Sequence, residues 1–175
     1  MSTSINSQIV LDFLALLVLG GLLGTLTLAF RLEIGDRLRE SALDVLLVVA
    51  VGATLGSLYL SEVVGLVPCE LCWFQRIAMY PLAVLLLVAR IRRDRGILPY
   101  VLTLSLIGLG ISAYHVQLQM FPDQSSFCEV DNPCSNTQAE GFGVFTIPQL
   151  TAGCFVILTI MSIAALRYDH RLESP

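Results

Sequence analysis

Four of the five cysteines form two close pairs, and each pair has a spacing suited to reversible disulfide chemistry. The first pair, Cys69 and Cys72, is a C-x-x-C motif, and the second pair, Cys128 and Cys134, is a C-x5-C motif. Two thiols at such spacings can close a disulfide and open it again by exchange with another thiolate. The pairs therefore predict redox chemistry, static disulfides or a metal site.

Two further side chains are candidates for the same site. Arg76 follows Cys72 by four residues, so in a helix it lies on the same face, one turn deeper. A cation there favours a thiolate, and a helix N-terminus close to Cys72 acts in the same direction. The other interpretation of Arg76 is that it reaches outward to a lipid phosphate. His115 is a candidate hydrogen-bond donor to a bound carbonyl group, although a lone histidine there is often only an interfacial polar residue.

The elements that position these residues are apolar segments long enough to cross a bilayer. Apolar residues make up 55% of the 175 residues, and the 13 glycines raise that share to about 62%, against roughly 45–50% in soluble domains. A bilayer core requires about 20 helical residues. The candidate spans are residues 8–30, 42–61, 73–89, 97–116 and 146–166. Uninterrupted apolar runs are not barrel strands, so we predict an all-α integral membrane protein with five spans.

The arginines predict the orientation of these spans. Nine of the ten basic residues fall between spans one and two, between spans three and four, or after span five. The positive-inside rule makes that side cytoplasmic. The N-terminus and both cysteine loops then lie outside, where disulfides persist. The first eight residues carry no basic side chain, so we interpret the first apolar run as a retained span rather than a cleaved signal peptide.

A zinc site is the alternative use of four cysteines, and three features disfavour it. The x5 spacing exceeds the usual ligand spacing of about 2–4 residues. The site would be extracytoplasmic, where thiols oxidise, and Arg76 would repel a cation. We therefore expect no metal. The fifth cysteine, Cys154, lies inside an apolar segment without a partner, and we interpret it as a packing residue.

The residues around these motifs resemble the DsbB/BdbC family of disulfide bond formation proteins. Residues 68–76 read PCELCWFQR and are followed by Met-Tyr-Pro at 79–81, which resembles the C-x-x-C-x-x-x-R signature of that family, closest to the BdbC branch. Residues 115–122 resemble the end of the third core helix of the family and the loop after it. Residues 143–149, GVFTIPQ, resemble the start of its last core helix. The resemblance covers roughly residues 42–166.

The resemblance implies a fold, an activity and partners. It implies a four-helix transmembrane bundle over residues 42–175, so residues 1–41 are an extra N-terminal transmembrane helix and a cytoplasmic loop. The implied activity is that of a thiol:quinone oxidoreductase in the bacterial cytoplasmic (inner) membrane, which supports disulfide formation in exported proteins. It would reoxidise a DsbA/BdbD-like partner with a thioredoxin fold. Its electron acceptor would be a membrane quinone, either ubiquinone or menaquinone. No nucleic-acid partner is expected.

The resemblance also implies roles for single residues. Cys72 would face the quinone, with Cys69 as its disulfide partner, and Arg76 and His115 would contact the quinone. Cys128 would form the mixed disulfide with the reduced partner. Cys134 would then attack Cys69.

Two functions from other classes remain as alternatives. The first is a VKOR-like quinone reductase, but in those proteins the loop pair precedes the C-x-x-C motif, whereas here it follows. The second is a non-catalytic tetraspanning scaffold whose disulfides are static, and a metal carrier is a variant of that alternative. The short second cysteine loop and the extra first helix also depart from the four-helix pattern of the family.

Overall fold

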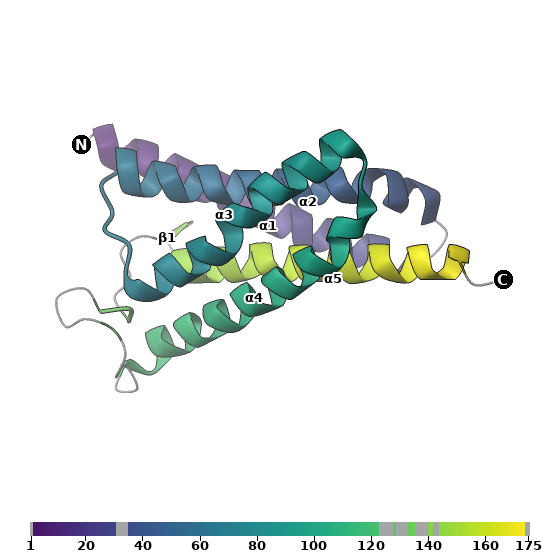
Figure 1. Ribbon diagram of the computed structural model, residues 1–175. Helices are drawn as coiled ribbons and strands as arrows, with labels where there is room; N and C mark the ends of the chain where they lie inside the picture. Colours follow the sequence, from purple (N-terminus) through teal and green to yellow (C-terminus); the bar gives the residue numbers. More distant parts are fainter. Residues whose placement is uncertain are drawn as a thin grey trace.

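Five long helices make up most of the protein in a computed structural model, which describes residues 2–30, 35–122, 128, 133–135, 140–141 and 144–173. The helices are α1 (Ser2–Phe30), α2 (Gly35–Leu58), α3 (Glu70–Arg92), α4 (Leu98–Met120) and α5 (Ile147–Glu173) (Figure 1). Each of the five contributes a segment long and apolar enough to cross a membrane. This confirms the predicted all-α membrane fold.

The observed helices extend beyond the apolar runs that predict them. The third helix, for example, begins at Glu70 rather than at residue 73, and it ends at Arg92, where Arg93 adopts a left-handed conformation with φ of 55°. A π-helical turn, η2 (Tyr59–Val63), continues α2, and a short 3-10 helix, η3 (Arg95–Ile97), precedes α4. Polar residues at a helix end still form backbone hydrogen bonds, so hydropathy alone makes a predicted helix such as α3 too short at both ends.

Helices α2 to α5 enclose the main apolar core, and α1 packs against its outside. The core centres on Leu46, Leu82, Leu86, Val101 and Phe155, all fully buried. Helix α1 contacts α5 and α2 and shares a second cluster with them through Leu11, Ala15, Leu60 and Leu150. The four-helix bundle with one additional helix therefore matches the prediction. The division of the chain at residues 41 and 42 stays a prediction, and in the structure it falls within α2.

Small and polar residues let α4 and α5 approach closely. A Cβ atom added at Gly108 would lie 2.2 Å from the Phe155 ring, which therefore occupies the space above the glycine. Next to this contact, the Thr159 hydroxyl donates to Ser105 Oγ at 3.1 Å. Close helix packing through small residues and interhelical hydrogen bonds is how helices associate where lipid removes the hydrophobic driving force.

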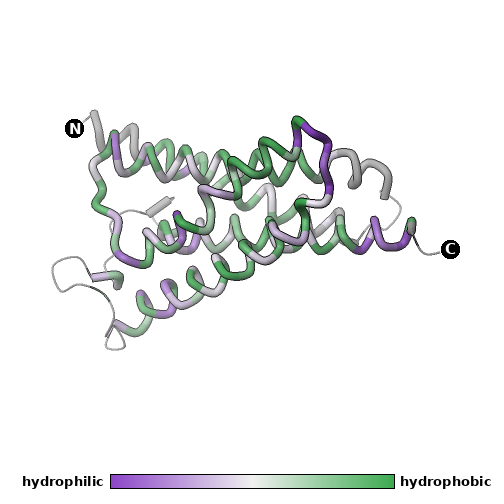
Figure 2. Tube along the Cα trace, in the orientation of Figure 1, coloured by the Kyte–Doolittle hydropathy of each residue, from purple (hydrophilic) through white to green (hydrophobic). Residues whose placement is uncertain are grey.

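The two ends of the bundle differ in chemistry. The starts of α1 and α3 and the end of α4 lie at one end, and the α3–α4 connection and the end of α5 lie at the other (Figure 1). At the second end, Arg90 pairs with Asp44 and Arg95 with Asp169. Figure 2 shows hydrophilic residues at both ends of the bundle and apolar residues along the helices between them. The assignment of the arginine-rich end to the cytoplasm stays a prediction.

A two-stranded hairpin links the second cysteine loop to α5. Strand β1 (Glu140–Gly141) pairs antiparallel with β2 (Phe145–Thr146), and α5 begins directly after β2. The Thr146 hydroxyl donates to Gln119 Oε1 at 2.8 Å, at the end of α4. The hairpin therefore anchors the returning chain beside the end of α4, from which the loop departs.

Candidate functional site

The first cysteine pair lies at the N-terminus of α3. Cys69 is the residue that caps the helix, in an extended conformation with φ of −71° and ψ of 172°, and Cys72 lies in the first turn. Pro68 precedes the cap. Proline favours an extended conformation in the residue before it, here Val67, so the helix does not begin earlier in the chain. The two Sγ atoms are 2.9 Å apart. A disulfide needs about 2.05 Å between the sulfurs, so a small side-chain movement suffices to close it.

The hydrogen bonds in this arrangement favour a thiolate at Cys69. The hydrogen bond from the Cys72 thiol, and then the one from His115, lower the pKa of the Cys69 thiol well below its usual value, while burial acts in the opposite direction. The sequence analysis favours a thiolate at Cys72 instead. The two sulfurs are 2.9 Å apart, and either one can be the donor in the hydrogen bond between them.

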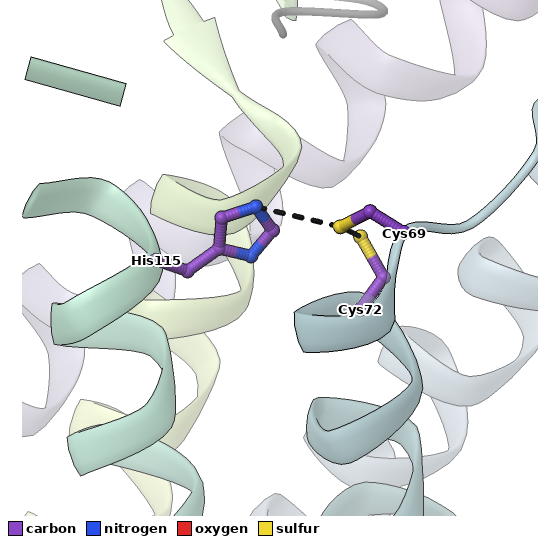
Figure 3. Close-up of side chains that lie close together, drawn as sticks. All are labelled: Cys69, Cys72 and His115. Atoms are coloured by element: carbon purple, nitrogen blue, oxygen red, sulfur yellow. Dashed lines mark hydrogen bonds between the residues drawn. The ribbon is translucent and has the colours of Figure 1, made fainter. Parts of the chain in front are cut away.

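His115 connects the first cysteine pair with the second. It lies on α4, is only 2% exposed, and has Nε2 at 3.7 Å from Cys69 Sγ (Figure 3). The same Nε2 lies 3.1 Å from the backbone oxygen of Cys134. A carbonyl oxygen only accepts hydrogen bonds, so Nε2 carries the hydrogen in this contact. Nδ1 is buried with no hydrogen-bond partner among the described residues.

The second cysteine pair is a disulfide packed against the first pair. Cys128 and Cys134 are bonded, with their Cα atoms 5.9 Å apart. Cys134 is 1% exposed and belongs to one apolar cluster with Cys69 and Leu118, against which Cys72 and Cys128 also pack. The structure therefore brings all four predicted cysteines together. His115 is 46 residues from Cys69 in the chain, and the second cysteine pair is farther still from Cys69.

Arg76 is held on the other side of Cys72 by α2. Its Nε donates to Ser57 Oγ at 2.9 Å and its Nη2 donates to the Ser57 carbonyl at 3.1 Å. Tyr80 donates its hydroxyl to the same Ser57 Oγ at 3.4 Å. The guanidinium also lies over the Trp73 ring, 5.1 Å from its centroid, at a distance typical of a cation–π contact. These contacts fix the arginine inside the bundle, which the lipid-phosphate interpretation does not predict.

A cavity lies beside Cys72 and Arg76. It is lined by residues of α2, α3, α5 and the segment between α2 and α3, which are Ala53, Ser57, Leu60, Ser61, Leu66, Pro68, Cys72, Gln75, Arg76, Met79, Tyr80, Ile147 and Thr151. The predicted pair of Cys72 and Arg76 thus shares one cavity. His115 is not a lining residue, since it lies on the Cys69 side.

Sequence reasoning missed Ser57 and Tyr80 as members of the site. Both belong to apolar spans. Ser57 is 19 residues from Arg76, so its position in the chain gives no sign of their contact, whereas Tyr80 follows Arg76 by four residues and so lies on the same face of α3. The one available signal was a hydroxyl residue inside an apolar span. Gln75 was missed for the same reason; it is buried and donates to Ser112 Oγ at 3.0 Å.

Three of the site residues also form a possible metal-ligand group. The Sγ atoms of Cys69 and Cys72 and a ring nitrogen of His115 lie within 4.8 Å of one another. This set differs from the four-cysteine site considered from the sequence, because Cys128 and Cys134 are bonded to each other. The set exists only while the first pair is reduced, since a disulfide removes both thiolate ligands.

Comparisons with known proteins agree with this geometry. Residues 39–165 match the family model described as "Disulfide bond formation protein DsbB". A relative named "Disulfide bond formation protein C" from Bacillus subtilis is 44% identical over 115 residues, which cover 65% of this chain and 83% of the relative.

Two further relatives carry similar names. A "Probable disulfide formation protein C" from Halalkalibacterium halodurans is 42% identical over 121 residues, covering 67% of this chain and 88% of the relative. A "Probable disulfide formation protein" from Coxiella burnetii is 40% identical over 126 residues, covering 70% and 86%. No solved structure matches the chain. With its five apolar helices and its two facing cysteine pairs, the chain belongs to the DsbB family of membrane proteins that form disulfide bonds.

Proposed function

We propose that the protein reoxidises an extracytoplasmic dithiol protein with a thioredoxin fold and passes the two electrons to a membrane quinone, either ubiquinone or menaquinone. One observation carries the proposal. The Cys69–Cys72 pair lies between the loop disulfide on one side and a cavity with a fixed arginine on the other. A relay needs both contacts, because the pair must receive electrons from a thiol and release them to an acceptor.

The thiol steps are those that the family resemblance implies, and the clustering of the four cysteines supports them. With Cys69 and Cys72 oxidised, a thiolate of the partner attacks Cys128 and releases Cys134 as a thiolate. Cys134 attacks Cys69, and the Cys69–Cys72 bond breaks, leaving a thiolate on Cys72 beside Arg76. The second thiol of the partner then displaces Cys128, which attacks Cys134 and releases Cys69. The partner has gained a disulfide, the loop disulfide is restored, and Cys69 and Cys72 hold two electrons and their protons.

The residues of the cavity fit a quinone head group. A quinone supplies the oxidising power, since it accepts two electrons and two protons from a dithiol. The remaining N–H groups of Arg76 and the Ser57 hydroxyl offer hydrogen-bond donors in a cavity that Ser61, Gln75 and Thr151 also line. The enclosed volume is about 70 Å³. That volume is small for a ring, so binding requires flexible lining side chains such as Met79 to move outward.

The direct test is quinone reduction by the purified protein. Reduced thioredoxin-fold partner is added to protein in lipid nanodiscs that contain a quinone, and the quinone absorbance is followed. We expect one quinone to be reduced for each partner disulfide formed. A static scaffold predicts that no cysteine changes its redox state in this mixture, and that outcome would reject the proposal.

His115 is expected to assist exchange between the two cysteine pairs. Its Nε2 holds the Cys134 carbonyl near Cys69, and its free Nδ1 can accept a proton while Cys69 is a thiolate. General acid–base groups contribute roughly 10²–10⁴-fold to rates, and we expect His115→Ala to slow partner-dependent quinone reduction by about 100-fold. Reduction driven by a small dithiol, which reaches Cys69 and Cys72 directly, should slow much less. Equal losses with both donors would place His115 at the quinone instead, as the family resemblance implies.

The orientation in the membrane is the second expectation from this proposal. The partner must reach Cys128, so the cysteine end of the bundle faces outward and the C-terminus faces the cytoplasm. Reporter fusions check this prediction. A phosphatase that is active only outside the cytoplasm should be inactive when fused after Arg93 and active when it is inserted between α4 and β1. Activity after Arg93 would reverse the orientation.

A further inference from the structure

A second and larger cavity lies between α1, α2 and α5. Its volume is about 360 Å³, within the range of roughly 300–1,000 Å³ typical of small-molecule sites. Apart from Asp44 and Cys154, all of its lining residues are aliphatic or glycine. The lining consists of Leu14, Val18, Gly21, Asp44, Val45, Val48, Val49, Gly52, Ala53, Cys154 and Ile157.

The two cavities follow one another along the same helix faces. On α2, residues 45, 49, 53 and 57 are spaced by four and so share one face; the first two line the large cavity, Ser57 lines the Arg76 cavity, and Ala53 lines both. On α5, Ile147 and Thr151 line the Arg76 cavity, and Cys154, three residues later, lines the large one. The two cavities therefore lie next to each other, with Ala53 between them, and together they mark out a path from Cys72 along α2 and α5.

Helix α1 supplies the third wall of the large cavity. Most of α1 lies outside the part of the chain that matches the family model, which begins at residue 39. Close contacts with glycines of α2 and α5 fix its position. A Cβ atom added at Gly56 would lie 2.7 Å from the Leu14 side chain, and one added at Gly153 would lie 2.4 Å from the Val18 side chain. At Gly52, by contrast, an added Cβ atom would meet nothing within 4 Å, so this position faces open space inside the cavity.

We propose that this path holds the isoprenoid tail of the quinone and that α1 closes it on the side of the lipid. The inference rests on the proposed function, because the head group beside Arg76 brings the tail to the mouth of the path. Tethering raises the effective concentration of the tail there above that of any free acyl chain. The path is polar at the Arg76 end and at Asp44, which is paired with Arg90, and apolar between them. A polar ring with an apolar chain matches the Arg76 end and the apolar length of the path, while the charge of Asp44 at the far end is compensated by Arg90.

The surrounding lipid determines which interactions can favour binding of the tail in this path. Moving an isoprenoid chain from lipid into this path yields no hydrophobic gain, because the lipid is as apolar as the protein. Selectivity for the tail therefore comes from van der Waals packing along α1, α2 and α5. Removing the space should weaken the binding of long-tailed quinones without removing the donors beside Arg76.

The test fills the path at Gly52 and uses a matched glycine elsewhere as control. Gly52→Leu places a larger side chain in the cavity, whereas Gly110→Leu places one on an exposed face of α4 where an added Cβ atom also meets nothing within 4 Å. Binding is read from quenching of the fluorescence of Trp73, the single tryptophan, which stacks on Arg76. Each protein, in nanodiscs of one lipid composition, is titrated with a ubiquinone that has no isoprene unit and with one that has eight.

We expect the Gly52→Leu protein to lose most of its preference for the long-tailed quinone. The ratio of the two apparent dissociation constants should change by about 10-fold relative to wild type, and Gly110→Leu should keep the wild-type ratio. Partitioning of the long quinone into the bilayer is the same for all three proteins and cancels in this comparison. Gly52→Val, which fills less space, should give an intermediate ratio and replaces Gly52→Leu if that protein shows no cooperative thermal transition.

Two negative results separate the two proposals. An unchanged ratio in Gly52→Leu, with quenching by both quinones intact, would mean that the tail lies elsewhere, and the function proposed above would stand. Absence of quenching and of turnover with either quinone in the wild-type protein would instead remove the proposed function itself.

Discussion

Serine in place of Cys69 or Cys72 is expected to abolish quinone reduction by every thiol donor. These two sulfurs are the only ones of the described residues that lie between the loop disulfide and the Arg76 cavity, and their Sγ atoms are 2.9 Å apart. Two electrons leave a dithiol only when its two sulfurs join, so a single remaining thiol cannot complete the reaction. The measurement is the loss of quinone absorbance with reduced partner and, separately, with a small soluble dithiol.

The loop cysteines provide the matched control for this prediction. Serine at Cys128 or Cys134 should abolish turnover with the partner and leave turnover with the small dithiol, because that donor can attack the partly exposed Cys72 without the loop. Expression and thermal stability of all four variants are compared first. Sustained partner-dependent turnover in Cys69→Ser would contradict the relay, and equal losses with both donors in Cys128→Ser would give the loop disulfide a structural role.

Much of the fold was predictable because the bilayer imposes strong rules on composition. Five apolar runs of sufficient length predicted five helices, and the structure confirms them. The ends of the helices were harder to predict. The polar first turn of α3 at Glu70 belongs to the helix although it adds nothing to the apolar run. Helix ends depend on capping and backbone hydrogen bonds, which hydropathy does not measure.

The candidate site was predictable in its residue types and less so in its pairings. The spacing of Cys72 and Arg76 placed both on one helix face, and the structure puts both at one cavity. The side of α4 that His115 would face could not be predicted, because helices in lipid are apolar all round and their rotation leaves no clear periodic signal. His115 therefore meets Cys69 and the Cys134 carbonyl rather than the cavity beside Arg76.

The packing of α1 against the other helices could not be predicted from the sequence. An additional apolar run predicts a span and nothing about the helices that it contacts. The structure places α1 against α2 and α5, with small residues at the contacts and an open space at Gly52. Cys154, which the sequence analysis assigns to packing, packs against the main core and also lines that space.

Arg76 is expected to determine how well the protein uses a quinone. Its guanidinium is held by Ser57 and Trp73 next to Cys72, so it can stabilise both the Cys72 thiolate and negative charge that develops on an acceptor in the cavity. Removal of one positioned donor in an enzyme typically costs about 10²–10³-fold in rate, and we expect a loss of that order in quinone-dependent kcat/KM for Arg76→Ala. Exchange of disulfides with the partner should persist for one turnover, because it does not involve the cavity.

Arg76→Lys separates the charge from the geometry. Lysine keeps the positive charge but loses the planar fork that reaches Ser57 through two nitrogens, so we expect a smaller loss, of about 10-fold. Ser57→Ala leaves the arginine in place and removes one of its anchors, and its effect should resemble that of Arg76→Lys. The measurement is quinone-dependent turnover over a range of quinone concentrations, with single-turnover oxidation of the partner as the control. If Arg76→Ala keeps the wild-type KM and kcat for quinone, the arginine serves only to anchor α3 to α2, and the acceptor must bind elsewhere.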